Sequence, residues 1–221
     1  MAVQVVGVEL STFTRTVRMA LEYLEVPYEL VRTAPHSTVA YKHNPFGRIP
    51  TLIHDELIVN ETLAIRIYID HTFGSAARTL TPPDLPAILA IGQWISMASD
   101  YAFRGLVHGI CKPRQAMEAK GANEQEIQEK LKDAVTQGQE ILRGLESQFI
   151  RLGSGGQTFL AGESLTWADL FLFPIFSDLC AMPERALVQK EAPKLYAWYE
   201  RFVSMDIARI THDGTVAAAR L

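Results

Sequence analysis

Apolar and polar residues in the first third of the chain follow two different periods. The run from Gln4 to Val8 is apolar and β-branched, which is typical of a buried strand. Apolar residues at 17–24 then repeat at the i, i+3, i+4, i+7 spacing of an amphipathic helix, and Pro27 follows that helix. A second β-type run covers Tyr28 to Arg32. This order predicts a β-α-β unit with parallel strands and a right-handed crossover.

Residues 33–47 show neither period, and we expect an irregular segment there. Two short β runs follow, Thr51 to Ile53 and Leu57 to Val59, and the polar residues between them predict a tight antiparallel hairpin. Helical spacing returns at 64–71. The N-terminal part is therefore expected to have the order β-α-β-irregular-β-β-α.

Residues 74–86 carry three prolines and no periodicity, which predicts a linker. Every later apolar pattern is helical. The expected helices start near Ile88, cover 127–149, start at Thr166, and cover 195–202. We therefore expect two domains, an α/β domain over 1–76 and an all-helical domain over 87–221, joined by a linker at 77–86.

The composition, with 48% apolar and 21% charged residues, is that of an ordinary globular protein. The formal net charge of −4 disfavours nucleic-acid binding, which needs a basic face. No apolar run reaches the roughly 18 residues that a membrane span requires, and the N-terminus lacks a signal-peptide pattern. Cys111 and Cys180 have no metal-ligand spacing and indicate buried thiols in a reducing compartment. We expect a cytoplasmic protein without metal, cofactor, nucleic-acid partner or membrane partner.

The first candidate for chemistry is Ser11, between the first strand and the first helix. Serine is a favoured N-cap, so one interpretation is a plain cap. The other is that the hydroxyl and the partial positive charge of the helix end stabilise an anion. Lowering a thiol pKa by about two units takes roughly 2.7 kcal/mol. A charge-assisted hydrogen bond of about 1.5–3 kcal/mol and a helix end of about 0.3–1 kcal/mol supply it.

Two further segments have a structural and a ligand-binding interpretation. Pro50 directly precedes a strand; if the Ile49–Pro50 bond is cis, the backbone of Ile49 faces outward and pairs with an extended peptide ligand. Otherwise Pro50 is an ordinary loop proline. Glu61 and Thr62 open the next helix, where a hydroxyl and free N–H groups bind a carboxylate and Glu61 pairs with an ammonium. Plain capping is the alternative for that pair.

Thr166 and Asp169 have the spacing of a capping box, with Asp in place of the usual Glu or Gln. Leu165 and Leu170 flank them at the positions of a hydrophobic staple. We interpret this motif as structural, because it starts a helix and fixes the angle at which the chain enters it.

Together, in this order and spacing, these four motifs resemble the cytosolic glutathione transferases over nearly the whole chain. The N-terminal motifs are most similar to the serine-type classes, above all the phi class and related fungal enzymes. The matched positions are Ser11 with Thr14 and Arg15, Asn44 to Pro50, Glu61 with Thr62, and Thr166 with Asp169. Each motif alone is weak, but four in sequence order make a chance match improbable.

The resemblance implies a thioredoxin-like α/β domain followed by an all-α helical bundle. It implies glutathione as the co-substrate, with the γ-glutamyl end at Glu61 and Thr62, the cysteinyl backbone at Ile49 and the sulfur at Ser11. In a competing interpretation, the hydroxyl that faces the thiol is that of Thr12, the next residue in the chain. The basic residue for the glycyl carboxylate is not fixed. Its candidates are His36, Lys42 and Arg48.

The implied activity is conjugation of the glutathione thiolate to hydrophobic electrophiles, as in detoxification, with glutathione-dependent peroxide reduction as a second activity. The family is dimeric, so a homodimer is implied as well. Two alternatives share the fold: a carrier of hydrophobic ligands (a ligandin), and a protein-interaction module. The intact Ser11 and Glu61–Thr62 set argues against the module. The expected pocket for the electrophile is formed by Phe13, Tyr101, Phe103, Arg104 and His108.

Overall fold

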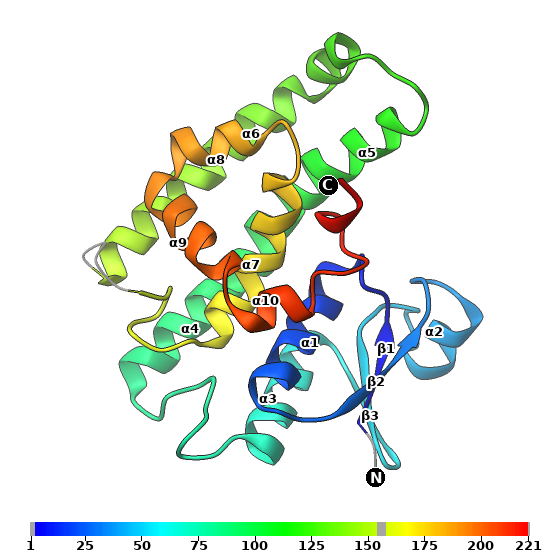
Figure 1. Ribbon diagram of the computed structural model, residues 1–221, viewed down its shortest axis with the longest axis vertical. Coiled ribbons are helices and arrows are strands. Elements are labelled where there is room, and N and C mark those ends of the chain that lie inside the picture. The colour runs from blue at the N-terminus through cyan, green and yellow to red at the C-terminus, as the bar shows by residue number, and fades with distance from the viewer. Residues whose placement is uncertain (1–2, 154–157, 221) are drawn as a thin grey trace.

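A four-stranded mixed sheet forms the N-terminal part of the chain (Figure 1). The computed structural model describes residues 3–153 and 158–220. The strands are β1 (Val3–Gly7), β2 (Tyr28–Arg32), β3 (Thr51–His54) and β4 (Leu57–Asn60), in the sheet order β2-β1-β3-β4. β1 pairs parallel to β2 and antiparallel to β3, and β3 pairs antiparallel to β4. The predicted β-α-β unit and hairpin are confirmed.

Helices α1 (Thr12–Tyr23) and α3 (Thr62–Phe73) pack against each other and against the sheet. The segment expected to be irregular contains a short helix, α2 (Thr38–His43). Only Ala40 of α2 is buried, so its sequence carries no apolar period from which a helix could be predicted. The helix is started by Ser37, whose hydroxyl accepts a hydrogen bond from the backbone N–H of Ala40 at 3.1 Å.

The connection between the two parts runs from Phe73 to α4 (Leu85–Met97). Asp84 is the N-cap of α4, and its carboxylate accepts from the backbone N–H of Ala87 at 3.0 Å. Pro86 lies in the first turn, where a helix needs no N–H group. The last two residues of the proline-rich segment 74–86 are therefore helical.

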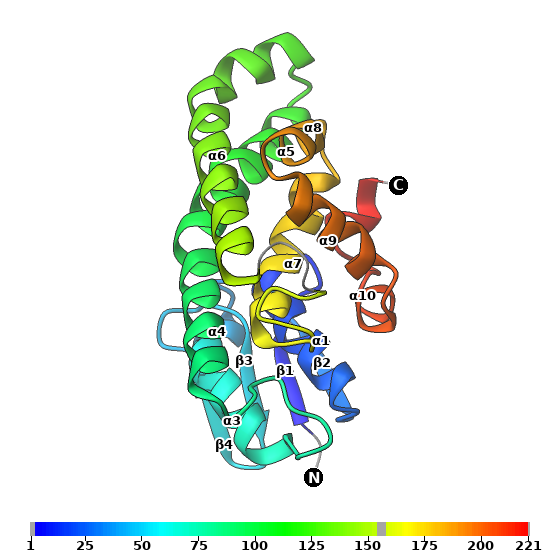
Figure 2. The same cartoon turned by 90° about the vertical axis from the view of Figure 1, so that its left-hand side faces the viewer.

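Beyond α4, the described residues form helices and the segments that connect them. The helices are η1 (Ala98–Cys111), α5 (Lys112–Glu118), α6 (Glu124–Gly153), α7 (Trp167–Cys180), α8 (Arg185–Glu191), α9 (Pro193–Val203), α10 (Asp206–Ile210) and the short 3₁₀ helix η2 (Ala218–Arg220). Every residue of α7 is buried, and η1, α4, α1, α8 and α9 pack around it. Figure 2 shows α6 running alongside α4 and η1. No helix within 3–153 and 158–220 is long and apolar enough to cross a membrane.

The helix η1 is π-helical, with bonds that span five residues; the N–H of Lys112 at its end bonds to the carbonyl of Val107. Sequence periodicity near 3.6 does not predict such a helix. The π-helical pitch brings side chains five positions apart to the same side, which matters for the candidate site.

Asp169, in the first turn of α7, is the most heavily hydrogen-bonded acid in the core. Its carboxylate accepts from the backbone N–H groups of Leu160 at 2.8 Å and Thr166 at 3.0 Å. It also accepts from the Thr166 hydroxyl at 3.0 Å and from the indole N–H of Trp198 at 3.0 Å. The contact predicted by the capping box, from the Asp169 side chain back to the N-cap Thr166, is therefore present. The same carboxylate also links α7 to α9, through Trp198, and to the segment before α7, through Leu160.

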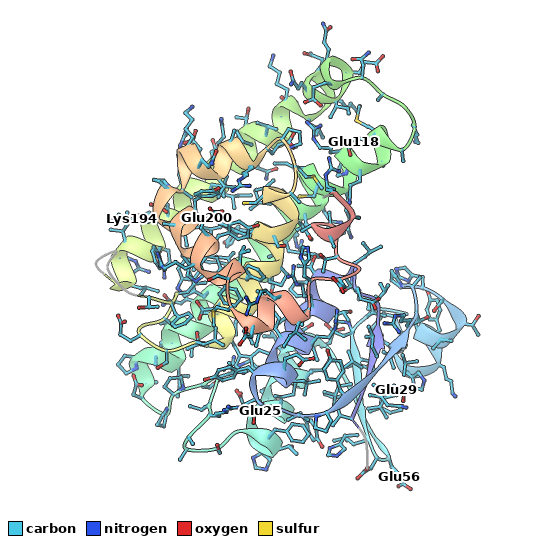
Figure 3. The ribbon with its side chains drawn as sticks, in the orientation of Figure 1. Glu25, Glu29, Glu56, Glu118, Lys194 and Glu200 are labelled. Atoms are coloured by element: carbon cyan, nitrogen blue, oxygen red, sulfur yellow. The ribbon has the colours of Figure 1, made fainter. Side chains whose placement is uncertain are left out.

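An ionic cluster closes the far end of the helical part, where Figure 3 labels Glu118. Arg114 is buried and pairs with Glu124 at 2.8 Å and Glu184 at 2.6 Å. Arg220 pairs with Glu118 at 2.7 Å, and this pair attaches the C-terminal segment to α5. Because a buried charge is costly when unpaired, these contacts fix the end of the chain against the bundle.

Candidate functional site

Ser11 caps α1, and its hydroxyl oxygen accepts a hydrogen bond from the backbone N–H of Thr14 at 3.3 Å. The residue is partly exposed. No described residue accepts a hydrogen bond from the hydroxyl in return. A hydroxyl has one proton to donate, so Ser11 keeps its donor capacity for a ligand at the helix N-terminus. The cap and the anion-binding interpretations are therefore compatible.

The two neighbouring hydroxyls are not accessible to a ligand. The Thr12 hydroxyl is buried and donates to the carboxylate of Asp178 on α7, at 3.2 Å. The Thr14 hydroxyl is also buried. Of the three hydroxyls at the start of α1, the one at Ser11 is the one that a thiol in solvent can reach.

Polar contacts dock α1 on the helical part. Arg15 is buried, donates to the Ser177 hydroxyl at 2.9 Å and to the carbonyl of Ala208 at 3.1 Å, and stacks over the ring of Phe173. Burial lowers the pKa of Arg15 to about 10, so it stays charged at neutral pH. Burial raises the pKa of Asp178 to about 7, against the opposing effects of Thr12 and Arg15. These contacts hold the N-terminus of α1, and with it Ser11, at the junction of the two parts.

The loop before β3 presents free backbone groups. The Ile49–Pro50 peptide bond is cis. Within the described residues, neither the N–H nor the carbonyl of Ile49 has a hydrogen-bond partner. The side chain of buried Asn44 shapes the loop, because its oxygen accepts a hydrogen bond from the backbone N–H of Phe46 at 2.8 Å. Gly47 takes a φ of 61°, and the ring of Tyr41 packs against this glycine.

The N-terminus of α3 has an unusual backbone. Glu61 is exposed and takes a φ of 65°, a left-handed conformation that non-glycine residues seldom adopt. It is the N-cap of α3, but its side chain makes no capping hydrogen bond. Thr62, partly exposed, opens the helix. The first N–H groups of α3 therefore have no side-chain partner and are suited to a carboxylate.

The three basic candidates for the glycyl carboxylate, His36, Lys42 and Arg48, are all exposed on the segment between β2 and β3. The imidazole of His36 bonds to the Tyr41 hydroxyl at 3.3 Å, and its backbone N–H bonds to the carbonyl of Gly47 at 2.7 Å. These contacts tie His36 to the loop that ends at Pro50.

Beside Ser11, three of the five residues expected in the second pocket come together. The rings of Phe13 and Phe103 lie 4.6 Å apart, and those of Phe103 and His108 lie 4.7 Å apart. Phe103 and His108 are five residues apart, and the π-helical pitch of η1 brings them together. Arg104 instead pairs with Asp100 at 2.9 Å, and Tyr101 is exposed.

Sequence reasoning missed two residues of this region. Asp178 is a carboxylate near the end of the largely apolar helix α7. A charged residue among apolar ones is a signal by which sequence analysis could have found it. Lys112 lies four residues after His108, with its ammonium 3.1 Å from the imidazole Nε2 of His108 and 5.6 Å from the centre of the Phe103 ring. The spacing of a cation four positions after a histidine was visible in the sequence.

Comparison with known families covers most of the chain. Residues 5–77 match the glutathione S-transferase N-terminal domain, and residues 95–206 match the glutathione S-transferase C-terminal domain. The chain belongs to the glutathione S-transferase family. The arrangement described above, a thioredoxin-like domain with a mixed sheet followed by an all-helical domain, is the fold of this family.

Relatives with several names match this chain at similar identity. It is 28% identical to glutathione S-transferase U15 of Arabidopsis thaliana over 216 residues, which cover 94% of this chain and 86% of the relative. It is 29% identical to glutathione S-transferase F6 of the same plant over 216 residues, which cover 94% and 97%. The comparisons therefore support the family and do not separate its classes.

A solved structure of similar fold holds a bound ligand. Glutathione S-transferase-I bound with lactoylglutathione is 21% identical, with a TM-score of 0.78 and full coverage of both chains. At this identity the likeness concerns the fold.

Proposed function

We propose that this chain is a glutathione transferase of the serine type, in which Ser11 holds the glutathione sulfur as a thiolate. The observation that carries the proposal is the Ser11 hydroxyl: it is partly exposed at the N-terminus of α1, and its proton is not donated to any described residue. The hydroxyls of Thr12 and Thr14 are buried. A donor and a helix N-terminus at one place favour the charged form of a bound thiol.

The remaining contacts with glutathione are assigned to residues of the sheet-containing domain. The γ-glutamyl carboxylate lies at the first turn of α3, with Thr62, and Glu61 pairs with the α-ammonium. The cysteinyl backbone pairs with the free N–H and carbonyl of Ile49. The lactoylglutathione bound to a protein of the same fold supports a glutathione-type ligand for this chain. Catalysis is then activation of the thiolate plus proximity to an electrophile beside Phe13 and Phe103.

The test is a conjugation assay with the purified protein, glutathione and a panel of aryl halides and unsaturated carbonyl compounds. We expect saturable turnover above the uncatalysed rate with at least one electrophile. A fluorescent hydrophobic ligand is titrated in parallel. Tight binding of that ligand with no turnover across the panel would instead support the carrier function, and the transferase proposal would be abandoned.

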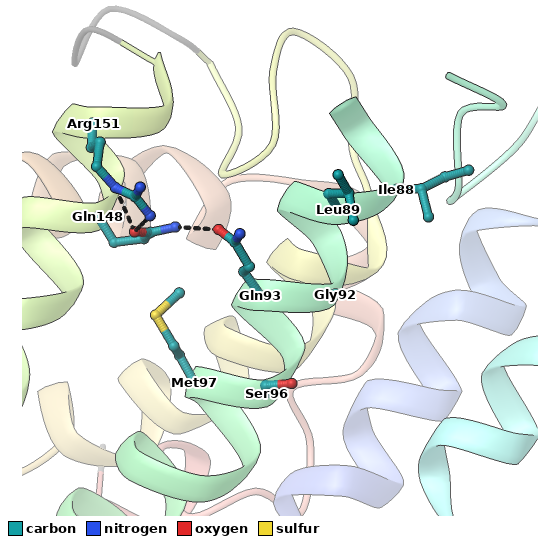
Figure 4. A pocket seen from close by; sticks show the side chains of 8 residues that line it. All are labelled: Ile88, Leu89, Gly92, Gln93, Ser96, Met97, Gln148 and Arg151. Atoms are coloured by element: carbon teal, nitrogen blue, oxygen red, sulfur yellow. Dashed lines mark hydrogen bonds between the residues drawn. The ribbon is translucent and has the colours of Figure 1, made fainter. Parts of the chain in front are cut away.

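We also propose that the chain forms a homodimer. Exposed apolar side chains gather on elements of both domains: Leu63 and Ile67 on α3, Leu57 and Ile58 on β4, and Leu85, Ile88 and Leu89 on α4. Ile88 and Leu89 line a groove between α4 and α6 whose floor carries the bonded pair Gln93 and Gln148 (Figure 4). Burial of such surface is the driving force for association.

Light scattering on a size-exclusion column should give twice the mass of the chain for the natural protein. Ile67→Lys should shift it to the mass of one chain, because a charge would be buried in the interface. Ile210→Lys, at another exposed isoleucine, on α10, serves as the control and should remain dimeric. A natural protein with the mass of one chain at micromolar concentration would contradict the proposal.

A further inference from the structure

A cation lies over the aromatic cluster beside Ser11. Lys112 begins α5 directly after η1, and its ammonium stands over the ring of Phe103. Phe103 in turn contacts Phe13, two residues after Ser11 in the chain. Phe13, which follows Ser11 by two residues, is thus joined to the rings of η1, and an ammonium lies at the edge of this aromatic cluster.

The charge of Lys112 is available to a ligand. Among the described residues, its hydrogen-bond partner is His108, and partial burial and Lys112 both lower the pKa of that imidazole. His108 is therefore neutral near pH 7 and accepts from the ammonium without compensating its charge. Arg104, the other cation of η1, is already paired with Asp100.

Asp178 attracts the charge of Lys112, but this carboxyl group is already engaged by other residues. Its side chain is buried, accepts from the Thr12 hydroxyl, and is also attracted to Arg15. Two cations, Lys112 and Arg15, thus face one carboxyl group at the junction. Arg15 is enclosed by α7 and α10, so the exposed Lys112 is the cation that a ligand can reach.

Glutathione does not account for Lys112. All the groups assigned to glutathione other than Ser11 lie on the sheet-containing domain, at Ile49, Glu61 and Thr62. Lys112 lies on the helical domain over the ring of Phe103, which in turn contacts Phe13. A negative charge bound by Lys112 therefore belongs to the second substrate.

We propose that the electrophile taken by this site is an aromatic compound that carries a carboxylate, with the ring against Phe13 and Phe103 and the carboxylate on Lys112. This inference rests on the proposed function and adds the substrate class. Cation and ring are arranged for such a ligand because an ammonium binds a carboxylate and aromatic rings pack favourably in tilted pairs.

With an aryl chloride as the electrophile, the reaction is a substitution. The glutathione thiolate attacks the ring carbon that bears chlorine, the C–S bond forms, and the C–Cl bond breaks with its electron pair leaving on chloride. The thiol proton has gone to solvent when the thiolate formed. Lys112 takes no part in these bonds and acts on specificity.

The test compares 4-chloro-3,5-dinitrobenzoate with its methyl ester, each rate divided by its uncatalysed rate. Lys112→Met removes the charge and keeps an unbranched apolar stem, and Lys132→Met, at an exposed lysine of α6, is the matched control. We expect Lys112→Met to lower kcat/KM for the acid by about five-fold, as for an exposed ion pair, and to leave the ester unchanged. The effect should shrink at high salt.

Binding gives a readout that does not depend on turnover. Calorimetry with 3,5-dinitrobenzoate and methyl 3,5-dinitrobenzoate, which have no leaving group, should show the same loss of affinity for the acid alone. Equal acid-to-ester ratios for the natural protein and Lys112→Met, in rate or in binding, would overturn the inference. If these two electrophiles and the whole panel fail to react, the proposed function fails, and the binding ratios still decide the role of Lys112.

Discussion

Replacing Ser11 by alanine should lower kcat/KM for conjugation by about 10- to 100-fold near neutral pH, because the thiolate loses a charge-assisted hydrogen bond of about 1.5–3 kcal/mol. The affinity for glutathione should change less, since the contacts at Ile49 and Thr62 remain. The loss should diminish as the pH rises, where the bound thiol ionises without help. Steady-state rates from pH 6 to 9 measure this.

The matched control is Ser37→Ala. Ser37 caps α2 with the same geometry as Ser11 caps α1, accepting from the N–H three residues ahead. Both variants lose a cap worth about 0.5–2 kcal/mol of stability. Only Ser11→Ala should change the pH dependence of the rate. Equal effects of the two variants on the rate would mean that Ser11 acts as a cap alone.

Replacing Asp169 by alanine should lower the free energy of unfolding by about 3–5 kcal/mol, the largest stability effect we expect in this chain. The change removes the carboxylate that accepts from the indole N–H of Trp198 and from the backbone N–H groups of Leu160 and Thr166 in the core. Urea unfolding followed by tryptophan fluorescence measures the loss.

Asp133→Ala is the control for this prediction, because Asp133 is exposed on α6. We expect that substitution to change stability by less than about 0.5 kcal/mol. A similar small effect of Asp169→Ala would show that the network around Trp198 does not hold α7, α9 and the segment before α7 together.

The strands and the long helices could be predicted because burial leaves a period in the sequence. β1 buries Val3, Val5 and Val6, and one face of α1 repeats at helical spacing. The short helix α2 could not be predicted, since it buries only Ala40 and is fixed by its cap at Ser37. The π-helical form of η1 depends on packing against α6 and α7, which no local pattern encodes.

The candidate site was predictable only in part, because some of its contacts join residues that lie far apart in the sequence. Ser11, Ile49 and Thr62 stand at element ends that local sequence marks. The choice between the hydroxyls of Ser11 and Thr12 required a residue far along the chain, because Asp178 engages Thr12. Lys112 likewise gains its place over Phe103 through the pitch of η1 and not through sequence spacing alone.

Titration of the bound thiol tests the central claim most directly. The ultraviolet absorbance of the thiolate is followed against pH for glutathione bound to the natural protein and to Ser11→Ala. We expect the natural protein to hold the thiol pKa about two units below the free value of about 8.5, and Ser11→Ala to return it most of the way. A shift of less than about half a unit on removing the hydroxyl would contradict the role proposed for Ser11.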